Sequence, residues 1–186
     1  KNNRGVFGKS SGGYGAIVHG MLYGDHWGAL ACHSGDMGFD SLFLGDFPKS
    51  VTHLEKHGGI QNFLDHIKNV KKMSGEDFHV LMMTAMGAFY DPDPNAPMGI
   101  RLPVDLRTCV LDEERWSAWL KHDPVFMIDR MDVQDSLKSL KGIFIDCGFK
   151  DQYNLHFGAR QLSDKLNKLG ISHIHEEFDD NHSSID

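Results

Sequence analysis

The sequence contains few cysteines and no long apolar run, and each of these two features excludes a class of protein. Its three cysteines, Cys32, Cys109 and Cys147, are far apart and odd in number, so they provide neither a disulfide framework nor a metal-binding spacing. We expect each of them to be a small buried apolar residue. No apolar run is long enough to span a membrane, and we find no internal repeat or low-complexity tract.

The balance of charge argues against another class of partner. With 26 acidic and 19 basic residues among 186, the formal net charge is −7, and the phosphates of a nucleic acid would be repelled. We therefore expect no nucleic-acid partner. The chain is 40% hydrophobic, which suffices for the buried core of one domain that carries an insertion.

Two segments partly match metal-binding motifs but lack essential residues. The segment DPDPNAP at 91–97 spaces its acidic residues like the start of a calcium loop. However, Ala96 replaces the required glycine, and Leu102 stands where the bidentate glutamate should be. The segment HLEKH at 53–57 puts two histidines four residues apart without the H-E-x-x-H order, so we expect a solvated polar helix face there and no metal site.

The segment VFGKSSGGYGA at 6–16 has the pattern of a buried strand that runs through a tight glycine turn into a helix. A phosphate-binding loop would need a glycine five positions before the Gly-Lys-Ser, and that position is Asn3. A G-x-S-x-G nucleophile elbow needs small residues two positions either side of its serine, which Gly8 and Gly12 provide around Ser10. The pattern favours the elbow, and a glycine-rich turn without chemistry is the alternative.

An acid and a histidine follow in the order that such an elbow requires, which is serine, acid, histidine. The apolar run 141–147 predicts a buried parallel strand, and Asp151 lies in the loop after it. Leucines at helical spacing predict a helix over 154–169, a strand is predicted over 171–178, and His182 follows in a polar turn. Open α/β sheets place functional groups beyond the carboxyl ends of their strands, so we expect the three groups at one rim of the sheet.

Four segments, GKSSGGYGA, ACHSGDMGF, IDCGFKDQYN and EEFDDNHSS, resemble the esterase D-like family of α/β-hydrolases, which hydrolyse acyl esters. The resemblance spans most of the chain and implies a catalytic triad of Ser10 as nucleophile, Asp151 as acid and His182 as base. Asp146, at the end of the same predicted strand, is the rival acid. In the family the acid directly precedes a Gln-Tyr-like pair, which favours Asp151.

The resemblance implies a serine carboxylesterase that acts on a small-molecule ester through an acyl-enzyme and needs no cofactor. An acyltransferase with the same triad and a non-catalytic binding relative are the alternatives. The amide N–H of Ser11 is the expected oxyanion donor. The second donor of this fold comes from a loop well before the elbow, yet the chain begins only a few residues before Ser10. We therefore expect the N-terminal strands of the fold to be lacking here, and either a longer protein or another chain, such as a second copy, to complete the sheet.

The expected fold class is α/β: a mainly parallel sheet flanked by helices, formed by 1–36 and 131–186, with a mostly helical cap or lid at 37–130. Further strands are predicted at 4–7 and 29–33, and helices at 13–23, 59–72, 75–90 and around Trp116 and Trp119. Asp36 follows the strand beside the elbow, where it binds substrate, anchors the insertion or caps a helix from Met37 onward. Acyl group, alcohol and cellular location are left open by the sequence.

Overall fold

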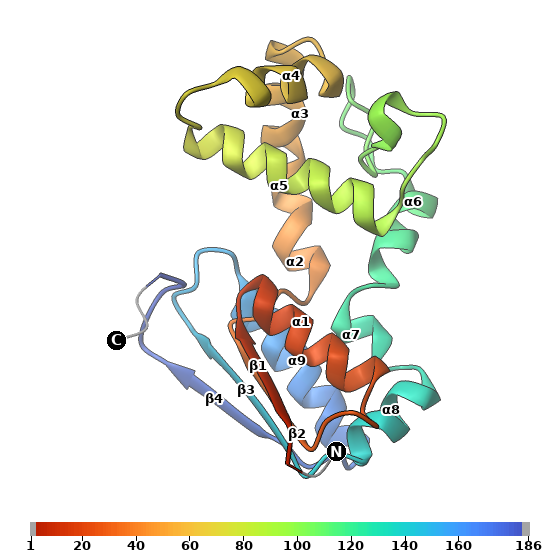
Figure 1. Ribbon diagram of the computed structural model, residues 1–186, viewed down its shortest axis with the longest axis vertical. Helices are drawn as coiled ribbons and strands as arrows, with labels where there is room; N and C mark the ends of the chain where they lie inside the picture. The colour runs from red at the N-terminus through yellow and green to blue at the C-terminus, as the bar shows by residue number, and fades with distance from the viewer. Residues whose placement is uncertain (1–2, 184–186) are drawn as a thin grey trace. The chain divides into compact units, whose positions relative to one another are not determined.

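The computed structural model describes residues 3–183 of the chain. It contains two compact units, one made of 1–44 and 123–186 and the other of 45–122 (Figure 1). The second unit lies inside the predicted insertion 37–130, while the segments on either side of it belong to the first unit. The role of the insertion as a cap or lid stays a prediction.

The first unit is built on a sheet of four parallel strands in the order β1-β2-β3-β4. The strands are β1 (Gly5–Lys9), β2 (Ala29–His33), β3 (Gly142–Gly148) and β4 (Ile174–Phe178). Each was predicted from the sequence to within a few residues at its ends. The first unit therefore has the predicted arrangement of a parallel sheet with helices between its strands.

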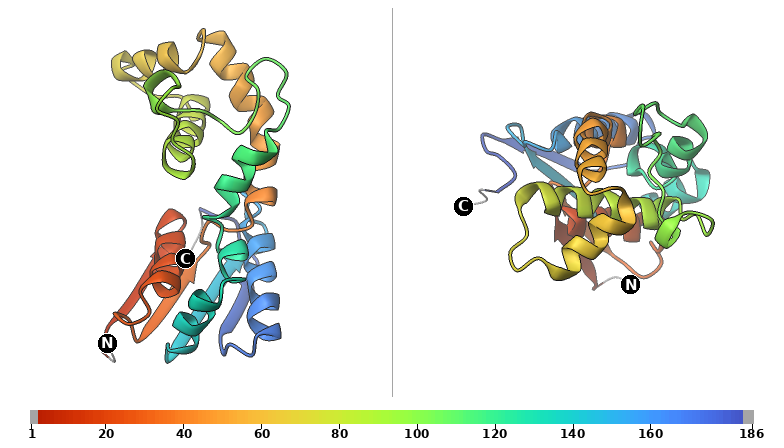
Figure 2. Two further views of the ribbon diagram at one scale, coloured as in Figure 1. Left: turned by 90° about the vertical axis from the view of Figure 1, so that its right-hand side faces the viewer. Right: turned by 90° about the horizontal axis from the view of Figure 1, so that it is seen from above.

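Helices cover one face of this sheet. They are α1 (Ser11–Leu22), α7 (Pro124–Met127), α8 (Met131–Lys138) and α9 (Leu155–Lys168), with the short α2 (Phe39–Phe43) against α9 (Figures 1 and 2). The crossovers through α1 and α9 advance in the same direction across the sheet, and right-handed crossovers of that kind place their helices on the same side. The side chains of Leu30, Ile143 and Ile145 are buried beneath this layer.

The opposite face of the sheet carries an apolar row. Strand register aligns Phe7, Ala31, Phe144 and Ile174 across the four strands. Because side chains alternate between the two faces of a strand, these residues point away from the helices that cover Leu30 and Ile143. Phe7 is 79% exposed and Ile174 is 57% exposed.

The second unit is helical. It contains α3 (Phe47–Lys56), α4 (Ile60–Asn69), α5 (Gly75–Tyr90) and α6 (Glu113–Leu120), with short 3-10 turns at Leu44–Asp46 and Pro97–Gly99. The helices predicted at 59–72 and 75–90 are thereby confirmed. Trp116 and Trp119 are buried and pack edge-on against Phe47 in the core of this unit. Among the described residues, no helix is long and apolar enough to cross a lipid bilayer.

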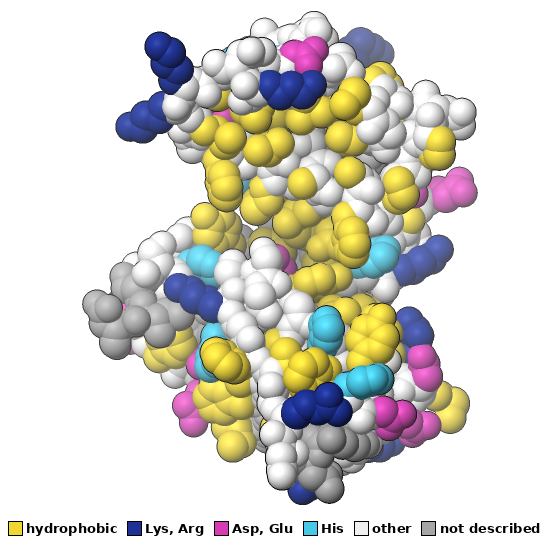
Figure 3. All heavy atoms as spheres, viewed as in Figure 1, with side chains coloured by type: hydrophobic (Ala, Val, Ile, Leu, Met, Phe, Trp, Pro, Cys, Tyr) yellow, Lys and Arg dark blue, Asp and Glu magenta, His cyan; other side chains and the backbone are white. Residues whose placement is uncertain are grey.

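The methionine and aromatic side chains of α5 divide between core and surface. Met83 and Tyr90 are buried, whereas Phe78 is 61% and Phe89 is 67% exposed. Hydrophobic side chains accordingly gather over α5 in the space-filling view (Figure 3). After this helix, the acidic residues of the proline-rich segment pair with Arg115. Its Nη1 lies 2.6 Å from Oδ2 of Asp91, and its Nη2 lies 2.7 Å from Oδ2 of Asp93.

One expectation about this unit is wrong. The histidines of HLEKH were expected on a solvated polar face, but His53 is only 9% exposed, and its Nε2 lies 3.0 Å from Oδ1 of Asp77. The sequence pattern could not reveal this burial, because the residues that cover His53 belong to α4 and α5 rather than to its own helix.

Candidate active site

Ser10 lies at the sharp turn between β1 and α1 in a conformation that serine rarely adopts. Its φ of 58° and ψ of −130° lie outside the regions of φ/ψ space that residues with a side chain ordinarily adopt. Backbone hydrogen bonds hold this turn, since Ser10 N–H donates to the carbonyl of His33 at 2.9 Å and Tyr14 N–H donates to the carbonyl of Ser10 at 3.0 Å. Strain of this kind is typical of functional sites and fits the predicted nucleophile elbow.

The glycines around Ser10 are needed for close packing. A Cβ added at Gly8 would collide with the backbone of Gly12. A Cβ added at Gly13 would lie 2.9 Å from the carbonyl oxygen of His33 and 2.9 Å from Cα of Gly35. The start of α1 can therefore approach β1 and β2 only without side chains at these positions, which explains the glycine-rich pattern of the sequence.

The structure places His182 beside Ser10, although 171 residues lie between them in the chain. His182 follows β4, and its Nε2 lies 2.9 Å from Oγ of Ser10. The ring meets Tyr153 edge-on at 5.0 Å between centroids, and the His182 backbone N–H donates to Oε1 of Gln152 at 3.1 Å. The imidazole is thus held on two sides by the loop that follows β3.

Asp151 contacts the other nitrogen of the same imidazole. Its Oδ2 lies 2.7 Å from Nδ1 of His182, and its Oδ1 accepts a hydrogen bond from the N–H of Tyr153 at 2.8 Å. The Asp151 side chain is fully buried. Burial opposes ionisation, but the hydrogen bonds from His182 and Tyr153 outweigh it and hold the pKa of Asp151 below its ordinary value. The carboxylate form is therefore favoured at neutral pH.

The rival acid has a different partner. Oδ2 of Asp146 lies 2.9 Å from Nδ1 of His33 on the neighbouring strand β2, at the position paired with it in the sheet. The structure therefore brings Asp151 to His182 and pairs Asp146 with His33.

Ser11 begins α1, directly after Ser10, so its amide has no partner four residues earlier within the helix. Such an amide suits the expected oxyanion donor. The Ser11 hydroxyl donates to Oδ2 of Asp36 at 3.1 Å. Asp36 is 8% exposed, and burial raises its pKa despite the opposing hydrogen bond from Ser11.

The helix-cap alternative for Asp36 is wrong, because a different aspartate takes that role. Asp123, which is 0% exposed, accepts hydrogen bonds from the N–H groups of Gly38 at 2.9 Å and Phe39 at 2.7 Å, where α2 begins. It also accepts one from the N–H of Val125 at the start of α7. Sequence analysis missed Asp123, although an aspartate directly before a proline is a common signal for the start of a helix.

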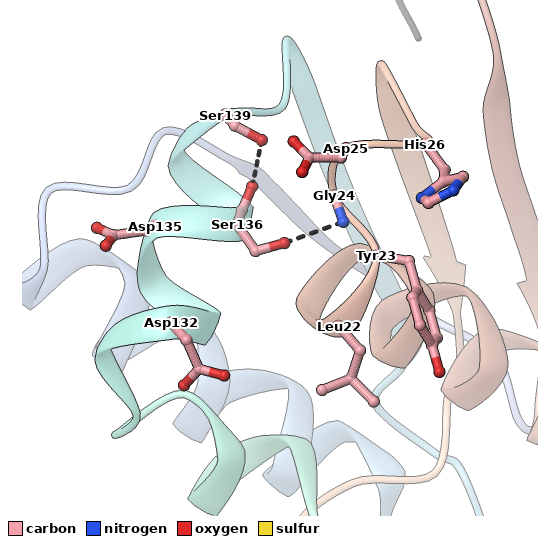
Figure 4. A pocket seen from close by; sticks show the side chains of 9 residues that line it. All are labelled: Leu22, Tyr23, Gly24, Asp25, His26, Asp132, Asp135, Ser136 and Ser139. Atoms are coloured by element: carbon pink, nitrogen blue, oxygen red, sulfur yellow. Dashed lines mark hydrogen bonds between the residues drawn. The ribbon is translucent and has the colours of Figure 1, made fainter.

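A cavity of about 320 Å³ lies away from these residues (Figure 4). Its lining includes Tyr23, Asp25, Asp132 and Ser136, and the hydroxyl of Ser136 accepts a hydrogen bond from the N–H of Gly24. The cavity adjoins the carboxyl end of α1, whereas Ser10 precedes its amino end. A helix of 12 residues spans about 18 Å, so this cavity is separate from the surroundings of Ser10.

No protein-family model matches the sequence, and a comparison with curated protein sequences finds no match. Solved structures do resemble it. A ferulic acid esterase superposes with a TM-score of 0.50 at 16% identity, over 98% of this chain and 45% of that chain. The fluorophosphonate-binding serine hydrolase F (FphF) of Staphylococcus aureus superposes with a TM-score of 0.45 at 16% identity, over 98% of this chain and 48% of that chain. A homoserine O-acetyltransferase from Bacillus anthracis superposes with a TM-score of 0.47 at 12% identity, over 94% of this chain and 52% of that chain.

The chain spans about half the length of these structures. At such low identity the likeness concerns the fold alone. The parallel sheet with its crossover helices and the strained turn at Ser10 agree with it. The chain therefore has the α/β-hydrolase fold that its sequence motifs implied, over about half the length of the solved examples.

Proposed function

We propose that this chain carries the catalytic triad of a serine esterase, with Ser10 as nucleophile, His182 as general base and Asp151 as the acid that orients it. The observation that supports this most directly is the position of the His182 ring, which has one nitrogen 2.9 Å from the Ser10 hydroxyl and the other 2.7 Å from the Asp151 carboxylate. Nucleophile, base and orienting group are then in hydrogen-bond contact, as this chemistry requires.

The proposed reaction has two steps. In the first, Nε2 of His182 takes the proton of Ser10 as Oγ attacks the ester carbonyl, and the tetrahedral intermediate collapses when the alcohol leaves with that proton. In the second, water loses a proton to Nε2 and attacks the acyl carbon. The bond between that carbon and Oγ then breaks, Oγ of Ser10 takes the proton back from Nε2, and the carboxylic acid is released. Asp151 stabilises the imidazolium in both steps and keeps Nδ1 protonated.

The negative oxygen of each tetrahedral intermediate needs N–H donors that are already in place. In this proposal one donor is the Ser11 amide at the start of α1, where the helix dipole also favours negative charge. Asp36 is kept as a candidate substrate-binding residue, because its carboxylate lies 3.1 Å from the Ser11 hydroxyl. The insertion at 37–130 is proposed to act as a lid.

The esterase D-like family is proposed on the four sequence segments that resemble it. The small-molecule ester substrate is part of the same proposal, and no cofactor is needed for the steps described. An acyltransferase would share the triad, so the fate of the acyl group, rather than the triad itself, separates the two activities.

The test is intact-mass spectrometry of the protein before and after a fluorophosphonate probe, combined with hydrolysis of p-nitrophenyl acetate. We expect one adduct and measurable hydrolysis in the wild type, and neither in Ser10→Ala. Ser11→Ala is the matched control, since it keeps the amide that the proposal uses and should still take the adduct. An adduct that persists in Ser10→Ala, or a wild type that neither reacts nor hydrolyses, would overturn the proposal. Diversion of the acetyl group to an added alcohol or thiol, at the expense of hydrolysis, would indicate acyl transfer.

A further inference from the structure

Three histidines and an aspartate converge within the helical unit, and none of them belongs to the triad proposed around Ser10. One nitrogen or oxygen ligand atom from each of His53, His57 and Asp77 lies within 4.8 Å of the others. His66 joins them, because its Nε2 lies 3.6 Å from Oδ1 of Asp77 and its ring centroid lies 4.6 Å from that of His57. Imidazole nitrogens and a carboxylate oxygen are the ligands that zinc takes from proteins.

Local structure explains why these side chains meet. His53 and His57 are four residues apart at the end of α3, so they lie on one helix face. Gly58 and Gly59 follow with φ values of 77° and 105°, which only glycine adopts readily, and this turn leads back into α4 with His66. Asp77 lies in the first turn of α5, where its Oδ2 accepts a hydrogen bond from the N–H of Ser74.

One imidazole of the cluster, that of His53, is nearly buried and only partly hydrogen-bonded. His53 is 9% exposed, and among the residues that the structure describes its Nδ1 makes no hydrogen bond. This nitrogen lies 3.4 Å from Oε2 of Glu76, whose side chain is 79% exposed. The ring of Phe63 packs against both His53 and His57 and forms an apolar wall beside them. Burying a polar nitrogen without a hydrogen bond is costly, and a metal ion bound through Nδ1 would remove that cost.

We propose that His53, His57, His66 and Asp77 form a zinc-binding site. Three imidazoles and one carboxylate supply the four ligands of a tetrahedral zinc ion, at about 2.0–2.2 Å from the metal. Ligand atoms around such an ion lie roughly 3.3 Å apart, so the side chains must close in from the 4.8 Å within which three of them now lie. His57 and His66 are only partly buried and can rotate toward the centre. The site tethers α3, α4 and α5 to one another and is independent of the function proposed for Ser10.

The alternative is that the cluster is only a hydrogen-bond network, in which His53 links α3 to Asp77. Calorimetric titration of the chelator-treated chain with zinc chloride separates the two. We expect one zinc per chain with the wild type. The variants His57→Gln and His66→Gln should each weaken binding by more than the roughly 10–100-fold that the loss of a supporting residue costs. His79→Gln is the matched control, because His79 lies on α5 outside the cluster and its Nε2 faces Asp46 at 3.4 Å.

Two further measurements guard against misfolded variants and adventitious binding. Cobalt in place of zinc should give the intense visible bands of a tetrahedral ion in the wild type and in His79→Gln, and weak bands in the two cluster variants. Zinc should also raise the unfolding temperature of the wild type by mass action, while leaving that of His57→Gln and His66→Gln unchanged. A wild type that takes up no zinc, cluster variants that bind like the wild type, or an equal loss in His79→Gln would each overturn the proposal.

Discussion

The carboxylate of Asp151 lies 2.7 Å from Nδ1 of His182, and both side chains belong to loops that follow neighbouring parallel strands. Asp146, only five positions earlier in the chain, is bound instead to His33. Two aspartates close together in sequence therefore have separate partners, and this difference allows their roles to be tested separately.

Substitution of the two aspartates should have unequal effects on turnover. In Asp151→Asn the His182 ring loses the partner that fixes its tautomer, so kcat for an activated ester should fall on the order of 10⁴-fold while KM changes little. Asp146→Asn should leave kcat within about tenfold, because its carboxylate contacts His33. Steady-state kinetics on p-nitrophenyl acetate measures both. A larger loss in Asp146→Asn than in Asp151→Asn would show that the acid has been misassigned.

The burial of Asp36 predicts a pH-dependent effect on stability. Because its pKa is raised in the folded state, folding becomes less favourable as the pH rises from the ordinary carboxyl range through the raised value. In Asp36→Asn this dependence is removed, and the amide oxygen can still accept the Ser11 hydrogen bond. The free energy of unfolding of Asp36→Asn minus that of the wild type should therefore be larger at pH 7 than at pH 3.

Urea unfolding at the two pH values measures this difference, and Asp164→Asn, at an exposed carboxylate of α9, serves as control. A relative stability of Asp36→Asn that is lower at pH 7 than at pH 3 would contradict the assignment of a raised pKa.

The buried Asp123 should be among the more costly aspartates to remove. Its carboxylate accepts three backbone N–H groups at the starts of α2 and α7. Asp123→Ala leaves these donors buried without partners and should lower the free energy of unfolding by roughly 2–4 kcal/mol. Asp123→Asn keeps one acceptor and should cost less. Equal stability of the alanine variant and the wild type in urea unfolding would mean that these hydrogen bonds contribute little.

Two glycines in the first turns of α1 should respond in opposite ways to alanine. At Gly13 the added methyl group would press on His33 and Gly35, so Gly13→Ala should destabilise the fold and disturb the turn that holds Ser10. At Gly15 an added Cβ meets nothing within 4 Å. Gly15→Ala should therefore stabilise the chain by about 0.5–1 kcal/mol through helix propensity. Unfolding midpoints of the pair, measured side by side, check this contrast, and a destabilised Gly15→Ala would contradict it.

Much of the fold follows from local patterns in the sequence. Alternation and apolar runs located the four strands, and helical spacing located α5 at its observed limits, because these patterns reflect which face of each element is buried. The glycines around Ser10 marked the turn, since only residues without side chains permit the observed approach of α1 to the sheet.

Other features depended on contacts between distant segments. Nothing within HLEKH indicates that His53 is buried against α4 and α5, and nothing near Gly38 indicates that Asp123 accepts its N–H. In both cases the decisive partner lies 24 or more residues away, at Asp77 for His53 and at Asp123 for Gly38. Such pairings are set by how helices pack in three dimensions.

Strand ends and turns are encoded locally, so the residue types that follow each strand, and their order along the chain, can be read from the amino-acid sequence alone. Which of these side chains contact one another depends on how the strands and helices pack in three dimensions. Parallel pairing brings the ends of β1, β3 and β4 to one rim, where Ser10, His182 and Asp151 meet across more than 170 residues of chain, while the pairing of β2 with β3 gives Asp146 to His33. Distances of a few ångströms between side chains depend on the register of the sheet, which no single segment of the sequence contains.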